Sequence, residues 1–310
     1  MRYNSYNHRF YFTGKGLRYF GIWATNVVLT VITLGLYYPW AKVAMRKFLW
    51  NETVLNEDRF VFHGTGMEIF RGFVIAYGMI AALIACIFIM PMGILIFYLG
   101  AMLLAPFAIY GGWRYRLSRT SWRGIHFSFR GDLGEFLGIY FVGLILTIFT
   151  FGIYASWWRV KIMKYLFSNS QLGNYELDFD GDGGELFGIN ILGIILSVVT
   201  FYIYLPWYIA NRFNFTFKNI AIHHDGMKSR LYSNLQGGDV LVLMITNMLL
   251  IIFTFGIGFP WAYMRTLKLY IESIEVPEEV NLDGLLQDAD DYDDATGDDL
   301  LDILDVGLEF

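Results

Sequence analysis

Three aspartates in an alternating run are the strongest candidate for metal chemistry in this chain. Asp178, Asp180 and Asp182 stand two residues apart and Gly183 follows, as in the first half of a calcium-binding loop. The twelfth position of such a loop needs a bidentate glutamate, and here it is Ile189. A turn with solvated carboxylates is therefore the favoured interpretation over calcium binding, and no metal or cofactor is predicted.

The remaining polar motifs do not assemble into an active site. His223 and His224 could contribute to a metal site, but adjacent residues on a strand point in different directions and no HExxH pair occurs. No GxSxG elbow, phosphate-binding loop or dinucleotide fingerprint stands between a strand and a helix. The single cysteine, Cys86, excludes a disulfide within the chain. We therefore expect a protein that is not an enzyme and has no catalytic residues.

The elements around these motifs are dominated by apolar residues. Of the 310 residues 56% are hydrophobic and 16% charged, with a mean hydropathy of +0.45, whereas a soluble domain carries about 25% charged residues. A membrane helix needs about 20 apolar residues, and Pro91-Met92-Gly93 divides the longest charge-free run in two. The sequence therefore predicts an all-α integral membrane protein in repeated units, with short β-like segments at the interface. About six transmembrane helices are expected, near residues 19–41, 72–90, 93–113, 136–158, 186–210 and 240–264.

Four of these spans, the first, fourth, fifth and sixth, share one pattern. A glycine-containing segment comes first, as Phe-x-Gly in three of them, and an acidic residue follows it in the last three. Each of the four ends in a Thr-x-Gly-type step and a Pro-Trp-type pair. The motif residues are Gly35, Pro39, Trp40, Gly131, Glu135, Gly152, Trp157, Gly181, Glu185, Pro206, Trp207, Gly256, Pro260 and Trp261.

Each part of the pattern has a physical interpretation. The first glycines permit a sharp turn into the helix, and carboxylates suit a helix N-terminus. Each span is expected to kink at its Pro-Trp pair and continue as a basic helix near the interface, where Lys42 and Arg46 reach lipid head groups. Ser156 replaces Pro and Tyr202 replaces Gly, which predicts less kinked exits there.

The exit from Thr33 to Ala41, together with the Phe-x-Gly segments, resembles the YjgN-like family of bacterial inner-membrane proteins of unknown function. The resemblance covers about residues 10–270 and implies a multi-pass protein of the bacterial inner (cytoplasmic) membrane. It brings no established activity or catalytic residues. It also suggests a candidate partner, because related genes can lie beside membrane zinc metalloproteases.

The two ends of the chain differ in charge. Residues 272–310 hold 15 of the 28 acidic residues and no Lys or Arg, which predicts a disordered tail after a membrane domain of residues 1–271. Alternatively, Leu282, Leu285 and Leu286 fall on helical spacing, so that the tail could dock on the basic loops of the chain itself or on a partner protein. Alternating spans would place both termini outside. However, every exit is basic, which suits re-entrant half-spans, and the topology stays open.

Two functions fit these features. The first is a non-enzymatic scaffold or adaptor for a membrane partner, with a membrane protease or a second copy of the chain as candidates. The second is a transporter or channel for a small solute or lipid, because interrupted helices in repeats often frame a substrate site. Membrane lipids are expected partners in both cases, and nucleic acid is not.

Overall fold

Five strand–helix–helix–strand segments follow one another along the chain and are called units 1 to 5 here. The computed structural model describes residues 8–89, 92–224 and 226–286. The first helices of the units are α1 (Gly16–Ile32), α3 (Gly66–Ile89), α5 (Leu133–Phe149), α7 (Gly183–Val199) and α9 (Gly237–Phe253). The returning helices are α2 (Tyr38–Asn51), α4 (Gly93–Ser118), α6 (Ala155–Ser168), α8 (Leu205–Lys218) and α10 (Phe259–Glu272).

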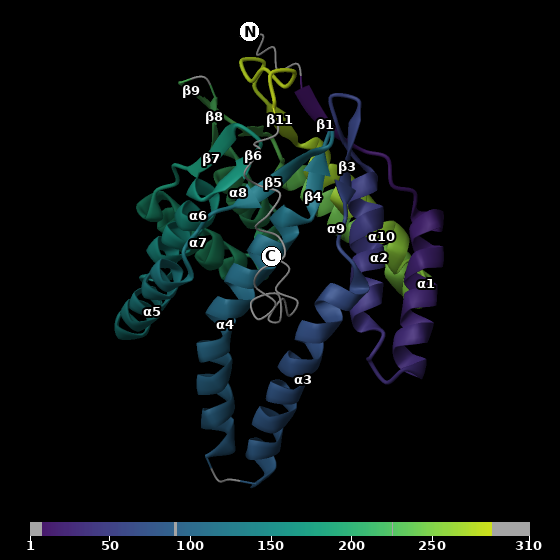
Figure 1. Ribbon diagram of the computed structural model, residues 1–310, viewed down its shortest axis with the longest axis vertical. Helices are drawn as coiled ribbons and strands as arrows, with labels where there is room; N and C mark the ends of the chain where they lie inside the picture. The colour runs from purple at the N-terminus through teal and green to yellow at the C-terminus, as the bar shows by residue number, and fades with distance from the viewer. Residues whose placement is uncertain (1–7, 90–91, 225, 287–310) are drawn as a thin grey trace.

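The strands of all five units form one antiparallel sheet. They are β1 (His8–Phe12), β2 (Thr53–Leu55), β3 (Asp58–Phe62), β4 (Thr120–Trp122), β5 (Ile125–Phe129), β6 (Ser170–Leu172), β7 (Tyr175–Phe179), β8 (Ile220–His224), β9 (Met227–Arg230), β10 (Tyr232–Ser233) and β11 (Ile274–Val276). Their order is β10-β11-β1-β2-β3-β4-β5-β6-β7-β8-β9. The ends of this order, β9 and β10, are separated only by Leu231, whose N–H donates to the carbonyl of Ile220 at 2.9 Å. The sheet is therefore a nearly closed barrel, seen at the top of Figure 1.

Within each unit the two outer strands bracket the helices. β1 pairs with β2, β3 with β4, β5 with β6, β7 with β8 and β10 with β11. A recurring hydrogen bond closes each unit: the residue directly after the leading strand donates its N–H to the carbonyl of the residue that caps the returning helix. The donor and acceptor residues are Thr13 and Glu52, His63 and Arg119, Arg130 and Asn169, Asp180 and Asn219, and Asn234 and Ser273.

The two helices of a unit form a hairpin, because the chain reverses where the sequence predicts a kink. In unit 1, Leu34 and Gly35 take φ values of 51° and 92°, which ends α1 in the left-handed region. The Thr33 hydroxyl donates to the carbonyl of Leu29 at 2.7 Å and accepts from the N–H of Tyr37 at 3.0 Å. The same pair of threonine bonds recurs at Thr150, Thr200 and Thr254.

The prediction of an all-α protein with about six transmembrane helices is therefore wrong. The β-like segments build an 11-stranded sheet, and two of the described helices, in residues 66–88 and 93–118, are long and apolar enough to cross a membrane. The predicted spans 19–41, 136–158, 186–210 and 240–264 each contain a first helix, a reversal and the start of a returning helix. Hydropathy does not reveal this reversal, because the turn carries no charge.

The expectation of less kinked exits at Ser156 and Tyr202 is also wrong. Tyr202 adopts φ 67°, so it turns the chain as the glycines of the other tips do, at some steric cost. Ser156 lies in the first turn of α6, where Pro39 lies in α2, and the reversal before it is the same. The threonine bonds therefore suffice to set the turn without the proline.

Tryptophans join neighbouring units. A Cβ added at Gly66, Gly183 or Gly237 would lie 2.3–2.4 Å from the ring of the Trp in the preceding unit, namely Trp40, Trp157 and Trp207. Trp261 of unit 5 packs in the same way on Gly16 of unit 1, so the units form a closed ring. At the junction of units 2 and 3 the corresponding residues are Phe107 and Leu133.

This contact predicts a contrast between two glycines of α7. An added Cβ at Gly183 meets the Trp157 ring at 2.3 Å and the Trp157 Cα at 2.9 Å, whereas at Gly188 nothing lies within 4 Å. We expect Gly183→Ala to destabilise the protein by about 1–3 kcal/mol through overpacking. Gly188→Ala should be neutral or slightly stabilising. Thermal unfolding of both variants in detergent checks this, and equal unfolding temperatures would refute the contact between the units.

Candidate functional site

The most unusual surface of the described chain lies at the ends of the helical hairpins. The residues at the reversals of units 1, 3, 4 and 5, called the apolar tips here, are Leu34, Phe151, Phe201 and Phe255, with exposed fractions of 87, 98, 89 and 96%. Large aliphatic residues flank each of them and are also exposed. Water is a costly environment for such clusters. The tips therefore require an apolar surrounding.

The distribution of charge shows how far this apolar surface extends. Distances along the chain are counted here from the second residue of each reversal, Gly35, Gly152, Tyr202 or Gly256. On the first helices of the four shorter units, the last charged residue stands 17 residues before it: Arg18, Glu135, Glu185 and Asp239. On α2, α6 and α10 the exposed basic residues follow the reversal by 9–12 residues: Lys47, Lys161, Lys164, Arg265 and Lys268. At 1.5 Å per residue this leaves about 14–18 Å of apolar hairpin below the cations. That length is close to half of a ~30 Å hydrocarbon layer.

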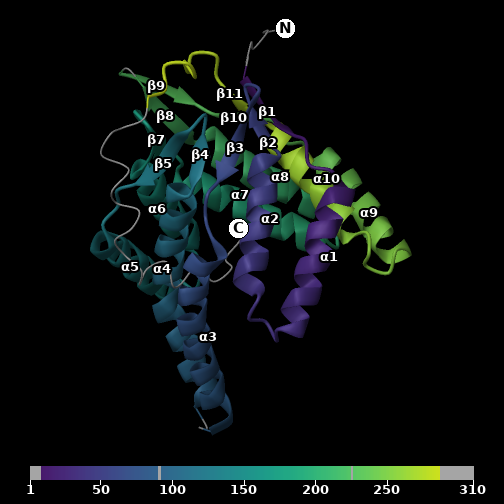
Figure 2. The ribbon, with the colours of Figure 1, turned by 45° about the vertical axis from the view of Figure 1, so that its right-hand side comes forward.

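Unit 2 differs from the others in length. Arg71 precedes Gly93 by 22 residues and Arg114 follows it by 21, which corresponds to about 32 Å of helix. Pro106 of α4 corresponds to Pro39 of unit 1, so that α4 is extended before it. In Figures 1 and 2 the α3–α4 hairpin reaches well past the other hairpins, which diverge from the barrel. Unit 2 is thus long enough to cross the hydrocarbon once in each direction.

The predicted motif residues all lie in this framework. Gly35, Gly152 and Gly256 have φ values of 88–92° at the reversals, Pro39, Pro206 and Pro260 begin the returning helices, and Trp40, Trp157, Trp207 and Trp261 join the units. Glu135 and Glu185 lie in the first turns of α5 and α7, where Asp132 and Asp182 cap their N–H groups at 2.8 and 2.9 Å. In each of these placements the residue sets a turn, a helix start or a contact between units.

Two expectations about this framework need correction. Gly131 and Gly181 do not have positive φ; instead an added Cβ would lie 2.5 and 2.3 Å from the Phe129 and Phe179 rings, so the glycines make room for the rings. Lys42 and Arg46 are buried, with 3 and 6% exposed, rather than extended towards head groups.

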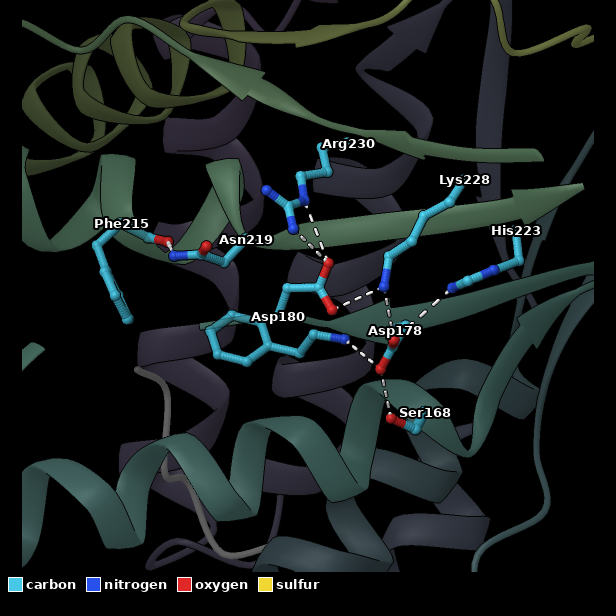
Figure 3. Close-up of polar contacts among 9 residues, drawn as sticks. Ser168, Asp178, Asp180, Phe215, Asn219, His223, Lys228 and Arg230 are labelled. Carbon is cyan, nitrogen blue, oxygen red and sulfur yellow. Dashed lines mark hydrogen bonds and ion pairs between the residues drawn. The ribbon is translucent and has the colours of Figure 1, made fainter. Parts of the chain in front are cut away.

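Apart from the apolar tips, a cluster of charged side chains lies on the barrel. In Figure 3, Asp178 of β7 and Asp180, which directly follows this strand, face Lys228 and Arg230 of β9. The Lys228 ammonium bridges both carboxylates, at 3.1 Å from Asp178 and 2.7 Å from Asp180, and Arg230 donates two bonds to Asp180 at 2.8 and 3.1 Å. The two aspartates are neutralised by cations of another strand of the sheet. Their carboxylates therefore link strands, which is a structural role and not the binding of calcium. Among the described residues no cluster of His, Cys, Asp and Glu has metal-site geometry.

The ionisation of this cluster follows from its contacts. Partial burial alone raises the pKa of Asp178, but hydrogen bonds from the Ser168 hydroxyl, the Phe179 N–H and Lys228 outweigh it and lower this pKa to about 2. The pKa of Asp180 is also below its ordinary value, because the bonds from Lys228 and Arg230 outweigh burial. Both groups are therefore carboxylates at neutral pH.

The two histidines do not act together. His223 points towards Asp178, with Nε2 3.7 Å from the carboxylate, as Figure 3 shows. His224 is 3% exposed and stacks on Tyr175 at 5.2 Å between ring centroids. They occupy opposite faces of β8 and cannot share a metal ion.

Residues 277–286, here called the mouth segment, cover one end of the barrel. Val280, Leu282 and Leu285 join an interior cluster with Trp122 and Tyr175, whose strands lie far apart in the sheet order. The Tyr175 hydroxyl donates to the carbonyl of Asn281 at 2.6 Å, and the Arg123 guanidinium donates to the Leu282 carbonyl at 3.1 Å and to the Asp283 carboxylate at 2.7 Å.

The mouth segment is the part of the site that sequence reasoning did not place. The predicted tail from residue 272 begins at the end of α10, and its first residues form β11 and the mouth segment. The apolar positions Leu282 and Leu285 were the available signal, although the segment is not helical and Leu286 is 68% exposed. Residues 287–310 lie outside the described residues.

The aspartate cluster predicts how stability responds to acid. Because the pKa of Asp178 is lower in the folded chain than its ordinary value of 3.8, its contribution is complete above about pH 5 and is lost as the pH falls towards 2. We expect the unfolding temperature in detergent to fall over this window, and Asp178→Asn to flatten the fall while lowering stability at neutral pH. Glu176→Gln, on the same strand, serves as the control. An unchanged pH profile for Asp178→Asn would contradict the assignment.

The chain resembles a family of bacterial proteins and several curated inner membrane proteins. Residues 7–174 and 207–303 match the family described as "Bacterial protein of unknown function (DUF898)". "Inner membrane protein YjgN" of Salmonella typhimurium is 36% identical over 129 residues, which are 41% of this chain and 32% of that protein. Its counterpart in Escherichia coli O157:H7 is 34% identical over 143 residues, 46% of this chain and 35% of that protein.

The matched part thus spans about a third of the length of these curated relatives. No solved structure matches the chain. The names of the relatives support a location in the bacterial inner membrane, and the resemblance to YjgN-like proteins is confirmed. The chain belongs to the DUF898 family of bacterial proteins of unknown function.

Proposed function

We propose that this protein is a non-enzymatic scaffold of the bacterial inner membrane, inserted from one side by five repeated helical hairpins. In this arrangement α3 and α4 cross the bilayer, and the four shorter hairpins enter it only to about the midplane. The observation that carries the proposal is the match of lengths: about 14–18 Å of apolar helix below the exposed cations of α2, α6 and α10 in units 1, 3 and 5, and about 32 Å in unit 2.

The sheet explains why all hairpins insert from the same side. Each hairpin leaves the barrel from one strand and returns to the strand paired with it. The exposed basic residues of the returning helices then lie on the barrel side of the membrane. Because Lys and Arg near membrane helices favour the cytoplasm, we place the barrel on the cytoplasmic side.

The packing favours a scaffold over a transporter. The barrel end is filled by Trp122, Tyr175 and Val280, which are 0–3% exposed, so the barrel axis offers no path there. Polar residues of the hairpins bond between helices: the Asn26 amide donates to the Ala41 carbonyl at 3.3 Å, and the Asn247 amide donates to the Ala262 carbonyl at 3.1 Å. Such bonds are a usual source of helix association in membranes.

The scaffold role predicts a partner at the barrel or at the spanning hairpin. Gentle extraction from the native membrane should recover the chain with a membrane protein in fixed ratio or with a second copy. A membrane zinc metalloprotease, suggested by the family resemblance, is one such outcome. Substitution of exposed barrel residues, for instance Tyr11→Ser and Val61→Ser, should reduce recovery, whereas Gly188→Ala should not. A chain that is always recovered alone would count against the scaffold role.

Insertion from one side predicts a labelling pattern. In a Cys86→Ala background, Tyr11→Cys, Glu176→Cys and Met227→Cys introduce exposed thiols in units 1, 4 and 5. An impermeant maleimide should label all three from the cytoplasmic side. Met92→Cys, next to the end of the α3–α4 hairpin, should be labelled from the other side. Alternating crossings would instead divide the three barrel thiols between the two sides, and that result would reject the proposed topology.

A further inference from the structure

The hairpins are distributed unequally between the two halves of the bilayer. With half-span insertion, the barrel-side leaflet contains all ten helices, whereas the far leaflet contains only α3 and α4. A helix with its side chains is about 10 Å wide. The eight additional helices therefore occupy roughly 600 Å² of the barrel-side leaflet, and no helix occupies a matching area in the far leaflet.

From this imbalance we propose that the protein bends the membrane, or gathers where it is already bent, with the barrel on the convex face. The proposal rests on the half-span insertion described above and goes beyond a scaffold role. The occupant of the apolar tips is then the acyl chains of a single leaflet. Expansion of one leaflet relative to the other is relieved when the bilayer curves towards the expanded side.

Two features keep the short hairpins in one leaflet. The exposed cations, such as Lys47, Lys164 and Lys268, each follow the reversal by 12 residues, and charged side chains resist transfer into hydrocarbon. Deeper insertion would carry them below the head groups, which their flexible side chains can offset only in part. The charged residue that stands 17 positions before each reversal likewise limits how deeply the first helix can enter the hydrocarbon.

The arrangement of the hairpins adds to the effect. Figures 1 and 2 show that they diverge from the barrel instead of gathering into one bundle. The tip residues are 87–98% exposed, so neighbouring hairpins do not cover them. Lipid therefore separates the tips, and each hairpin displaces its own share of acyl chains.

The test measures orientation against vesicle size. The full chain with Cys86→Ala and Glu176→Cys is reconstituted into neutral-lipid vesicles of mixed diameter, and an impermeant fluorescent maleimide reports barrels that face outward. Single-vesicle imaging gives this signal for each diameter, and labelling after detergent gives the total. We expect the ratio of outward to inward barrels to rise by about threefold or more from the largest to the smallest vesicles.

A matched pair of variants separates the tips from the anchor. Leu34→Asn, Phe151→Asn, Phe201→Asn and Phe255→Asn, combined in one chain, place Asn where φ is 51°, a conformation that Asn tolerates. These tips cannot stay in hydrocarbon, so the dependence on size should disappear while α3–α4 keeps the chain in the membrane. Met92→Asn also replaces an apolar residue by Asn, next to the end of the α3–α4 hairpin of unit 2, and should retain the dependence.

The outcomes distinguish this inference from the proposed function. A wild-type ratio that is the same at all diameters, in a chain that resists alkaline extraction, would overturn membrane bending and leave the anchored scaffold intact. Equal loss of size dependence in the Met92→Asn control would also overturn it, because the effect would then not come from the short hairpins. Extraction of the wild-type chain by alkali would instead reject the membrane insertion itself.

Discussion

Pairing between the leading and closing strand of each unit is the interaction on which the rest of the structure depends. It brings both ends of every helical hairpin to one end of the molecule, and the antiparallel contact of β1 with β11 extends the pairing around the ring. An apolar hairpin held in this way can enter a membrane only from the barrel side. In the proposed arrangement, the length of each hairpin decides whether it crosses the membrane, and the hairpin of unit 2 contains the two described helices that are long enough.

Much of the local structure could be predicted from the sequence, but its arrangement in space could not. The periodic motifs locate the strands, the acidic helix starts and the Thr-x-Gly steps, because these are local preferences of the chain. The reversal at Thr33 depends on a side-chain hydroxyl that bonds to both helices. A hydropathy profile does not detect such a bond. Strand pairing across 200 residues and more, as between His8 and Val276, and the burial of Lys42 depend on the completed ring.

The residues that first suggested chemistry also depend on the completed ring, because their partners come from distant parts of the sequence. These residues, Asp178 and Asp180, are neutralised by Lys228 across paired strands. The glycines and tryptophans of the motif serve packing between and within units. The surface left without a structural explanation is the set of exposed apolar tips, which only a lipid or protein environment can satisfy. These tips are suited to contact with the apolar part of a membrane.

Insertion depth is the central claim, and it can be measured directly at one tip. A spin label attached through Phe151→Cys, in a Cys86→Ala chain reconstituted into bilayers, reports depth by its collisions with oxygen and with a water-soluble nickel complex. The account predicts a position near the bilayer midplane, about 15 Å below the hydrocarbon boundary, while the same label at Met92 lies near the far boundary. A label at Phe151 that meets the nickel complex freely, from either aqueous side, would contradict half-span insertion.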